Sequence, residues 1–192
     1  PGKPPTIDAA RIDELRAGAG VNWQDQFFRS APFSNIVISA SGGSDDVDYY
    51  ISANTYKAKA TIINQDFNRL NLRANINAQL NDNLKVGINN FISRSENTGQ
   101  RADLAYGIPW DMNTPPRDEN GEYNSVPLIS AVGNGSNMPL LAPENNSVEN
   151  ISDQLISSIY ANYKFTDNIT LNISAGVEKI DFTNSRYVHG VT

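Results

Sequence analysis

The stretch from residue 69 to residue 80 alternates apolar and polar residues without interruption. Its odd-numbered positions hold only Arg, Asn and Gln, and its even-numbered positions hold Leu70, Leu72, Ala74, Ile76, Ala78 and Leu80. A period of two places all the aliphatic side chains on one face of a β-strand. Because strands in soluble domains are most often about five or six residues long, this alternation indicates a sheet with unusually long strands.

Similar alternation recurs on both sides of three short turns and predicts three β-hairpins. The turns are rich in Gly, Asp and Asn and fall at 42–46, 81–83 and 166–168. Longer connections run through 57–66 and from residue 96 to about residue 150. The expected fold class is therefore all-β, with about six antiparallel strands whose short turns lie at one end of the sheet and whose long loops lie at the other.

Two architectures fit this pattern. One is a soluble β-sandwich that serves as a binding or adhesion module, because a sandwich also buries one face of each strand. The other is a membrane β-barrel. At about 3.3 Å per residue and a tilt of about 45°, residues 69–80 would rise about 28 Å, close to the apolar band of about 25 Å in outer-membrane barrels. We therefore expect a segment of a large antiparallel transmembrane β-barrel, since such barrels need at least about eight strands to close.

In such a barrel, the aliphatic faces contact lipid and the polar faces line a wet lumen. The polar positions of two strands predict these lumen-lining residues: Arg69, Arg73, Asn75, Asn77 and Asn89. Asn90 is the polar exception on the apolar side of the strand that begins at Leu84. Aromatic residues near the strand ends fit either an interfacial girdle or the general enrichment of aromatic residues in sheets, and they are Tyr49, Tyr56, Tyr160, Tyr163 and Phe165.

The composition argues against catalysis and metal binding. The 192 residues include no cysteine and one histidine, His189, so a cysteine nucleophile, a disulfide and a cysteine zinc site are excluded. A net charge of −6 without a basic run argues against nucleic-acid binding. The longest aliphatic run, at 36–38, is far too short for a transmembrane helix. We expect no enzyme activity, no cofactor and no metal.

The pattern divides the chain into four parts. Residues 1–34 are expected to form an extracellular loop with one short helix that ends near Gly18 and Gly20, and residues 35–95 to form barrel hairpins. Residues 96–150 are expected to form a long extracellular loop. Residues 151–192 are expected to form a further barrel hairpin and the start of the next loop.

The long loop contains the best candidates for substrate contact. Tyr106, Trp110, Asp111 and Asn113 place aromatic rings beside hydrogen-bonding groups, a combination that suits sugars. The alternative is that Trp110 only stiffens a loop packed on the barrel mouth. Trp23 has two similar alternatives, which are docking of a lid protein and filling of a loop core.

A short acidic stretch in the same loop offers a candidate calcium site. Residues 118–121 have the spacing of oxygen ligands and turn glycine that begins a calcium loop. However, Ile129 occupies the position where such loops carry a bidentate Glu. A plain β-turn is therefore the favoured interpretation.

Several motifs, taken in order, resemble the SusC/RagA family of TonB-dependent outer-membrane transporters. They are IDAARIDELRAG at 7–18, VNWQDQFFRSAP at 21–32, ISASGGS at 38–44, YYISA at 49–53 and DFNRLNLRAN at 66–75. The resemblance covers about the first half of the chain well. It implies a large barrel filled by an N-terminal plug domain, and that plug domain is not in this chain.

The resemblance also implies a function. Members of the family carry out TonB-dependent active import of oligosaccharides or peptides across the outer membrane of Gram-negative bacteria. The implied partners are a SusD-like surface lipoprotein that forms a lid, the TonB complex acting through regions outside this chain, and outer-membrane lipid. A passive porin is the alternative among membrane proteins.

Overall fold

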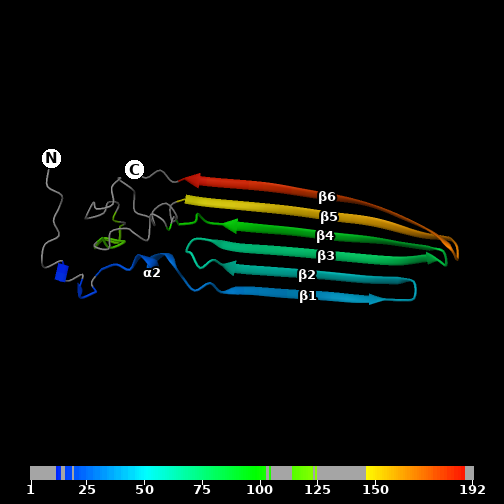
Figure 1. Ribbon diagram of the computed structural model, residues 1–192, viewed down its shortest axis with the longest axis horizontal. Helices are drawn as coiled ribbons and strands as arrows, with labels where there is room; N and C mark the ends of the chain where they lie inside the picture. Colours follow the sequence, from blue (N-terminus) through cyan, green and yellow to red (C-terminus); the bar gives the residue numbers. More distant parts are fainter. Residues whose placement is uncertain are drawn as a thin grey trace.

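The computed structural model describes residues 12–13, 16–18, 20–102, 104, 114–122, 124 and 146–188. Its main feature is one antiparallel sheet of six strands, in which each strand pairs with the next in sequence (Figure 1). The strands are β1 (Phe33–Gly43), β2 (Val47–Lys59), β3 (Asp66–Asn81), β4 (Leu84–Thr98), β5 (Asn146–Thr166) and β6 (Ile169–Val188). The predicted all-β fold is confirmed, including its three hairpins.

The strands are longer than the alternating patterns indicated. β3 has 16 residues, β5 has 21 and β6 has 20. β5 begins at Asn146, before the predicted start at residue 151, and β4 continues to Thr98, beyond the predicted end at residue 95. Strand pairing explains the extension, because Thr98 and Glu149 remain Cα partners where the sequence no longer alternates cleanly.

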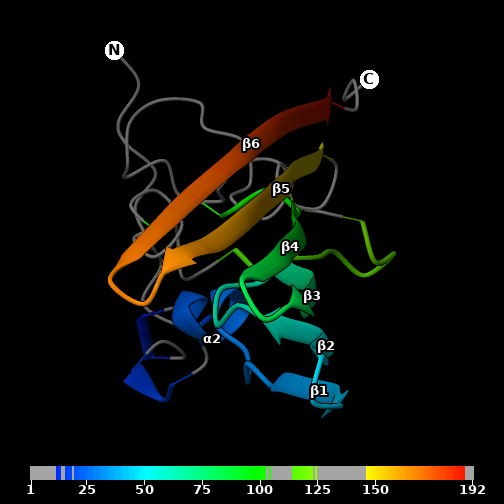
Figure 2. The same ribbon diagram turned by 90° about the vertical axis from the view of Figure 1, so that its right-hand side faces the viewer.

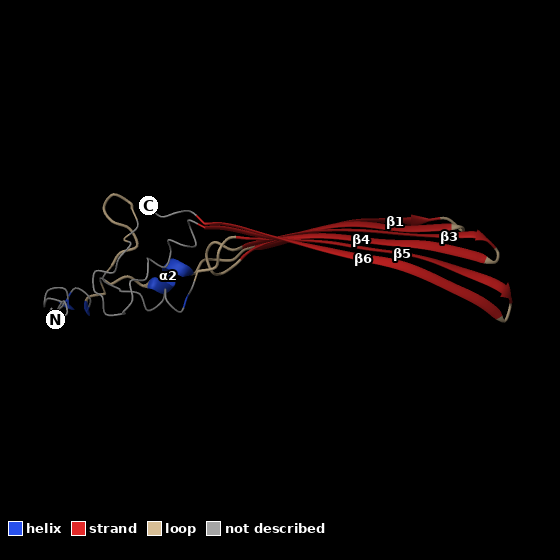
Figure 3. Ribbon diagram, turned by 90° about the horizontal axis from the view of Figure 1, so that it is seen from above, coloured by secondary structure: helices blue, strands red, loops and turns tan. Residues whose placement is uncertain are grey.

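The sheet is a single layer. Figure 3 shows it edge-on, and Figure 2 shows that the strand direction rotates from β1 to β6. Every residue of β1 and β6 is exposed, and within the described part of the chain no second sheet packs on either face. The β-sandwich alternative is therefore wrong, because a sandwich consists of two packed sheets.

Short turns and longer connections lie at opposite ends of the strands (Figure 1). The β1–β2 turn closes through the N–H of Ser44, which donates to the carbonyl of Val47 at 2.7 Å. In the β3–β4 turn, the side chain of Asn81 accepts from the N–H of Asn83 at 2.9 Å. The other end of the sheet, called the loop end below, carries the β2–β3 connection and helix α2 (Trp23–Phe27).

A small core lies at the loop end. Trp23 and Phe27, one turn apart on α2, are 3% and 0% exposed, and Ala102 completes the buried cluster. Partly buried aliphatic residues pack around it, namely Val21, Ile62, Ile63 and Leu104. Trp23 therefore fills a loop core, and the alternative in which it docks a lid protein is wrong.

Helix α2 adds to the one short helix predicted in this region. Residues 12–13 and 16 are helical as expected, and Gly18 has the left-handed φ of 86° that is common where helices end. α2 begins after Asn22, whose Oδ1 accepts the N–H of Gln24 at 3.2 Å. An Asn cap followed by aromatic residues four positions apart was the sequence signal for this helix. Within the described ranges, no helix is long and apolar enough to cross a membrane.

Arg29 fastens the segment before β1 to the β2–β3 connection. Its guanidinium donates to the carbonyl oxygens of Ala60 at 3.1 Å and Gln65 at 2.9 Å. It also pairs with the carboxylate of Asp66 at 2.8 Å. These contacts hold the loop end of the first hairpin against the small core.

Candidate functional site on the polar face of the sheet

The register sorts the alternating patterns of the strands onto two faces. Tyr49, Ile76, Ile88, Ile159 and Ala175 are successive Cα partners in one row across β2 to β6. Side chains in one row point to the same side of the sheet, and the next row points to the other side. One face, called the apolar face, is therefore largely aliphatic, and the opposite face, called the polar face, carries most of the amides and hydroxyls.

All five predicted lumen-lining residues lie on the polar face. Arg69, Arg73, Asn75 and Asn77 are alternate residues of β3, and Asn89 of β4 is the direct Cα partner of Asn75. The structure thus brings the five side chains together on one surface. Their exposure to a lumen stays a prediction.

A ladder of side-chain hydrogen bonds crosses the polar face from β1 to β4. Asn54 donates to Asn35 Oδ1 at 2.6 Å, and Asn71 donates to Asn54 Oδ1 at 3.3 Å. Ser93 extends the ladder by donating to Asn71 Oδ1 at 2.8 Å. Asn and Ser can donate and accept at once, so each links two neighbouring strands. The ladder stabilises the pairing and leaves further lone pairs and protons for a polar solute.

Both arginines of β3 lie over aromatic rings. The guanidinium carbon of Arg69 is 5.6 Å from the ring centroid of Tyr56, and that of Arg73 is 5.7 Å from the ring centroid of Phe91. A cation at this distance from a ring is attracted to its face. The rings therefore restrain both side chains while their N–H groups stay available to a ligand.

Asn77 is the centre of a second polar cluster. It donates to Asp48 Oδ2 at 2.6 Å and accepts from the hydroxyl of Tyr160 at 2.7 Å. The ring of Tyr160 lies over Gly87, where an added Cβ would be 2.2 Å from the ring. Gly87 is thus the residue that lets Tyr160 reach across β4.

The aromatic residues near the strand ends divide between the two faces. Tyr49 and Tyr163 lie on the apolar face, and Tyr163 meets the ring of Phe165 edge-on with 4.7 Å between centroids. Tyr56 and Tyr160 lie on the polar face, as partners of Arg69 and Gly87. The five aromatic residues therefore cannot all belong to one girdle, because girdle residues share the lipid-facing surface.

Asn90, the polar exception on the apolar face, has a partner on β5. Ser157 is its Cα partner and donates from Oγ to Asn90 Oδ1 at 2.6 Å. An unsatisfied polar group in hydrocarbon costs several kcal/mol. The hydrogen bond therefore pairs these two polar groups with each other on the apolar face.

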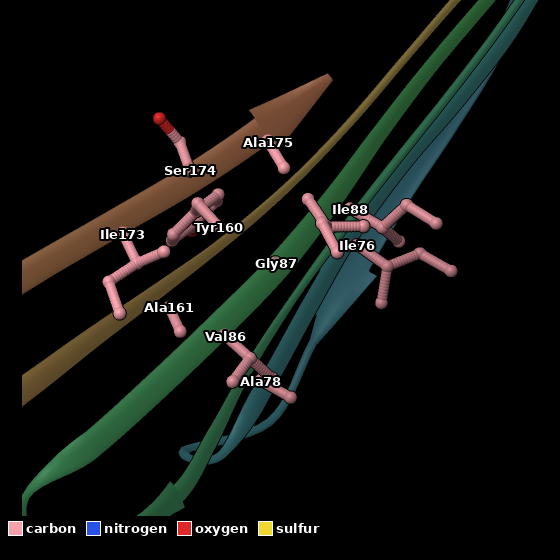
Figure 4. A pocket seen from close by; sticks show the side chains of 11 residues that line it. Ile76, Ala78, Val86, Gly87, Ile88, Tyr160, Ala161, Ile173, Ser174 and Ala175 are labelled. Atoms are coloured by element: carbon pink, nitrogen blue, oxygen red, sulfur yellow. The ribbon is translucent and has the colours of Figure 1, made fainter. Parts of the chain in front are cut away.

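The apolar face is hollowed near the turn end of β3 to β6 (Figure 4). The hollow has a volume of about 410 Å³, and Ala78, Ala161 and Ala175 leave room that the longer side chains of Ile76 and Ile88 border. No charged side chain lines it. This surface suits hydrocarbon and not a polar substrate.

The four loop residues predicted to contact substrate cannot be placed. Tyr106, Trp110, Asp111 and Asn113 lie outside the described residues, as does His189. Their roles stay predictions.

The acidic stretch in the long loop forms a turn. Asp118 Oδ1 accepts the N–H groups of Asn120 and Glu122, both at 2.9 Å, and Gly121 has a φ of 85°. This is the side-chain-capped turn that Asp favours, so the turn interpretation is confirmed. Among the described residues, no three His, Cys, Asp or Glu side chains group closely enough to hold a metal ion.

Comparison with known proteins shows where this sheet belongs. No protein-family model matches the sequence. TonB-dependent receptor P3 of Formosa agariphila is 27% identical over 171 residues, which cover 84% of this chain and 17% of that receptor. TonB-dependent receptor P26 of the same organism is 25% identical over 167 residues, which cover 86% of this chain and 16% of that receptor.

Solved structures of the RagAB peptide transporter share the fold. One aligns with a TM-score of 0.72 and 23% identity over 87% of this chain and 20% of its own. The RagAB peptide importer in the open-open state aligns with a TM-score of 0.73 and 24% identity over 87% of this chain and 19% of its own. The chain is therefore similar in sequence to TonB-dependent receptors, and its sheet has the fold of a segment of the RagAB transporter. Its location is the outer membrane of a Gram-negative bacterium, as predicted.

The chain spans 17% and 16% of the length of the two curated relatives. Sequence reasoning missed two residues that shape its polar face, Gly87 and Tyr160. A signal for the first was present, because a glycine inside a regular strand often marks a close approach. Tyr160 occupies an even-numbered position of β5, and these positions lie on the polar face. The girdle interpretation did not take this alternation into account.

Proposed function

We propose that this segment forms part of the wall of a barrel that imports a solute across the outer membrane with energy from the TonB complex. The observation that carries the proposal is the separation of side chains over the length of the strands into an aliphatic face and a hydrogen-bonded polar face. In a barrel, the first faces lipid and the second faces the lumen. The description of both curated relatives as TonB-dependent receptors supports the coupling to TonB.

The proposed substrates are oligosaccharides or peptides. The polar face offers amides, hydroxyls and the two guanidiniums of Arg69 and Arg73, which can donate hydrogen bonds to carbonyl and hydroxyl oxygens. The solved structures that share the fold are described as a peptide transporter and a peptide importer, which favours peptides. The extracellular loop would add contacts from Tyr106, Trp110, Asp111 and Asn113.

A SusD-like surface lipoprotein is the proposed lid over the loop end. A lid needs a surface of fixed shape on which to close. The first loop is held in one conformation by the buried pair Trp23 and Phe27 and by the three contacts of Arg29. This order is evidence for a surface of fixed shape at the loop end.

Cysteine labelling of the full-length receptor in intact cells tests the orientation of the sheet. This segment has no cysteine, so Asn75→Cys and Ile76→Cys can each be introduced singly into a cysteine-free receptor. A charged, membrane-impermeant maleimide should label the first variant and not the second, because neighbouring residues face lumen and lipid. Equal labelling of the two variants would contradict the proposal.

Uptake of labelled peptides and oligosaccharides tests the transport mode. Import should stop when the proton-motive force is collapsed, whereas a passive porin would continue to admit solute. Trp110→Ala should lower the apparent substrate affinity without lowering the amount of receptor in the membrane. Unchanged affinity would show that Trp110 only stiffens its loop.

A further inference from the structure

A hollow whose lining includes charged and polar side chains lies on the apolar face at the loop end of β1 to β4. It has a volume of about 370 Å³, and its polar lining includes Ser34, Lys57, Lys59, Asn68, Glu96 and Thr98. Four of these residues, at positions 34, 57, 68 and 96, are successive Cα partners in one row across the four strands. Charged side chains on this face of the four strands begin one row nearer the middle of the sheet, at Arg94. We call this site the head hollow.

The two lysines of the head hollow outnumber the carboxylates there that have no basic partner. Lys57 and Lys59 are both exposed, and neither forms an ion pair with any described residue. Asp66, which also lines the hollow, is bonded to Arg29 at 2.8 Å. Glu96 is the remaining carboxylate in the lining. With Asp66 paired to Arg29, two ammonium groups face one carboxylate, so the head hollow suits an anionic group flanked by hydrogen-bonding atoms.

An apolar hollow lies toward the middle of the sheet on the same face of the same strands. It has a volume of about 440 Å³, and its aliphatic lining includes Ile38, Ala40, Ile51, Ala53, Leu72 and Ile92. One row of side chains, from Ile36 through Leu70 to Arg94, separates it from the head hollow. The small side chains of its alanines leave room for a chain of methylene groups. We call this site the alanine hollow.

The spacing of the two hollows matches the thickness of a lipid headgroup layer. Lys57 and Ala53 both lie on β2. At about 3.3 Å per residue they are about 13 Å apart along the strand, which is about 9 Å along the bilayer normal at a tilt of about 45°. The polar layer on each side of a bilayer is about 5 to 8 Å thick. With the alanine hollow inside the hydrocarbon, the lysines therefore reach the headgroups.

We propose that the two hollows together bind one phosphorylated, acylated lipid of the outer leaflet. Its phosphate lies between Lys57 and Lys59, and one of its acyl chains lies in the alanine hollow. A free phosphate ion would leave the alanine hollow unfilled, and a lipid without phosphate would leave both lysines unpaired. This inference rests on the proposed function, because the loop end must face the outer leaflet.

Native mass spectrometry of the full-length receptor in mild detergent tests the proposal, with lipid A and its dephosphorylated form as probes. The double variant Lys57→Gln and Lys59→Gln should bind lipid A about tenfold more weakly, since each lysine near an anionic lipid contributes to binding. The double variant Lys85→Gln and Lys164→Gln removes the same charge at the turn end and should bind normally. The dephosphorylated lipid should bind weakly to the unmodified receptor and to both double variants.

A second pair of variants tests the alanine hollow. Ala53→Phe should weaken lipid A binding by filling the hollow, whereas Ala78→Phe adds the same bulk in the hollow of Figure 4 and should not. The shift in electrophoretic mobility on heating shows that each variant has a folded barrel. Unchanged lipid A binding by the lysine double variant, or equal affinity for the dephosphorylated lipid, would overturn the proposal.

Cysteine labelling separates failure of this proposal from failure of the proposed function. If Asn75→Cys is labelled and Ile76→Cys is not, the orientation of the sheet stands. Normal lipid A binding by the lysine double variant would then overturn the lipid site alone. If the two cysteine variants are labelled equally, both the proposed function and the lipid site are contradicted.

Discussion

The hydroxyl of Tyr160 on β5 donates to Oδ1 of Asn77 on β3 at 2.7 Å, across the full width of β4. The strand in between carries Gly87 at the point of crossing, as the Cα partner of both residues. Asn77 in turn donates to Asp48 on β2 at 2.6 Å. Tyr160 and Asn77 thus link β5, β3 and β2 on the polar face near the turn end, with β4 between them.

Gly87→Ala should destabilise the receptor through this crossing. An added Cβ would lie 2.2 Å from Cε1 of Tyr160 and 2.6 Å from Oδ1 of Asn77, so the ring must move and its hydrogen bond is lost. Overpacking of this kind costs about 1 to 3 kcal/mol. Denaturant unfolding of the full-length receptor in detergent measures the loss.

Two further variants make that result specific. Gly176→Ala places a Cβ no closer than 3.2 Å to another atom and should cost much less. In a Tyr160→Ala background, Gly87→Ala should lose most of its effect, because the clashing ring is absent. An equal cost of Gly87→Ala with and without the tyrosine would show that the crossing is not the cause.

Asn90 and Ser157 should behave as a coupled pair. Ser157→Ala leaves the amide of Asn90 without its partner on the apolar face, and Asn90→Leu does the same to the hydroxyl. The double variant removes both polar groups and should recover most of the loss. Interhelical side-chain hydrogen bonds in membranes have coupling energies of about 0.6 kcal/mol on average and at most about 1.7 kcal/mol, and we expect a value in this range. A double-mutant cycle on the free energy of unfolding measures it, and strict additivity would contradict the coupling.

Trp23→Ala should loosen the first loop without unfolding the sheet. The ring is 3% exposed and packs against Phe27 and Ala102, so its removal leaves a cavity. Truncation of a buried Trp costs about 3 to 5 kcal/mol, and here the cost falls on a core that is separate from the strands. Limited proteolysis of intact cells should cut within residues 20–30 faster in the variant. Phe28→Ala is the control, because Phe28 is 44% exposed, and cleavage at the wild-type rate in Trp23→Ala would contradict the role of the core.

Arg29→Lys should release the β2–β3 connection although the charge is kept. A lysine ammonium is a point charge on a flexible stem and cannot reproduce the fork that reaches Ala60, Gln65 and Asp66 together. Hydrogen bonds to charged groups contribute about 1.5 to 3 kcal/mol, so amide hydrogen exchange in residues 60–65 should accelerate at least about tenfold. Arg16→Lys changes an arginine with a side chain 78% exposed and should leave that exchange unchanged. Exchange that stays slow in Arg29→Lys would show that Arg29 does not fasten this connection.

The alternation of residues 69–80 was enough to predict the strand, its two faces and the family of long-stranded sheets to which it belongs. The same reasoning placed Arg69, Arg73, Asn75, Asn77 and Asn89 on one surface, because parity along a strand is a local property. Alternation predicted the ends of the strands poorly. β4 and β5 continue into polar sequence, where the strand persists because it pairs with its neighbour. The same alternation also predicts that Tyr56 and Tyr160 lie on the polar face. The girdle interpretation relied instead on their positions near strand ends.

The alternation of each strand is enough to define an aliphatic face and a polar face. Which positions meet across the sheet depends on how the strands pair in three dimensions. Ser157 satisfies Asn90 from 67 positions away and Tyr160 reaches Asn77 from 83 positions away, while Trp23 is buried beneath a loop that follows another strand. The physical reason is that a period of two constrains only the direction of a side chain. Its partners depend on the register between strands, which is set by the fit of whole strands and not by any one of them.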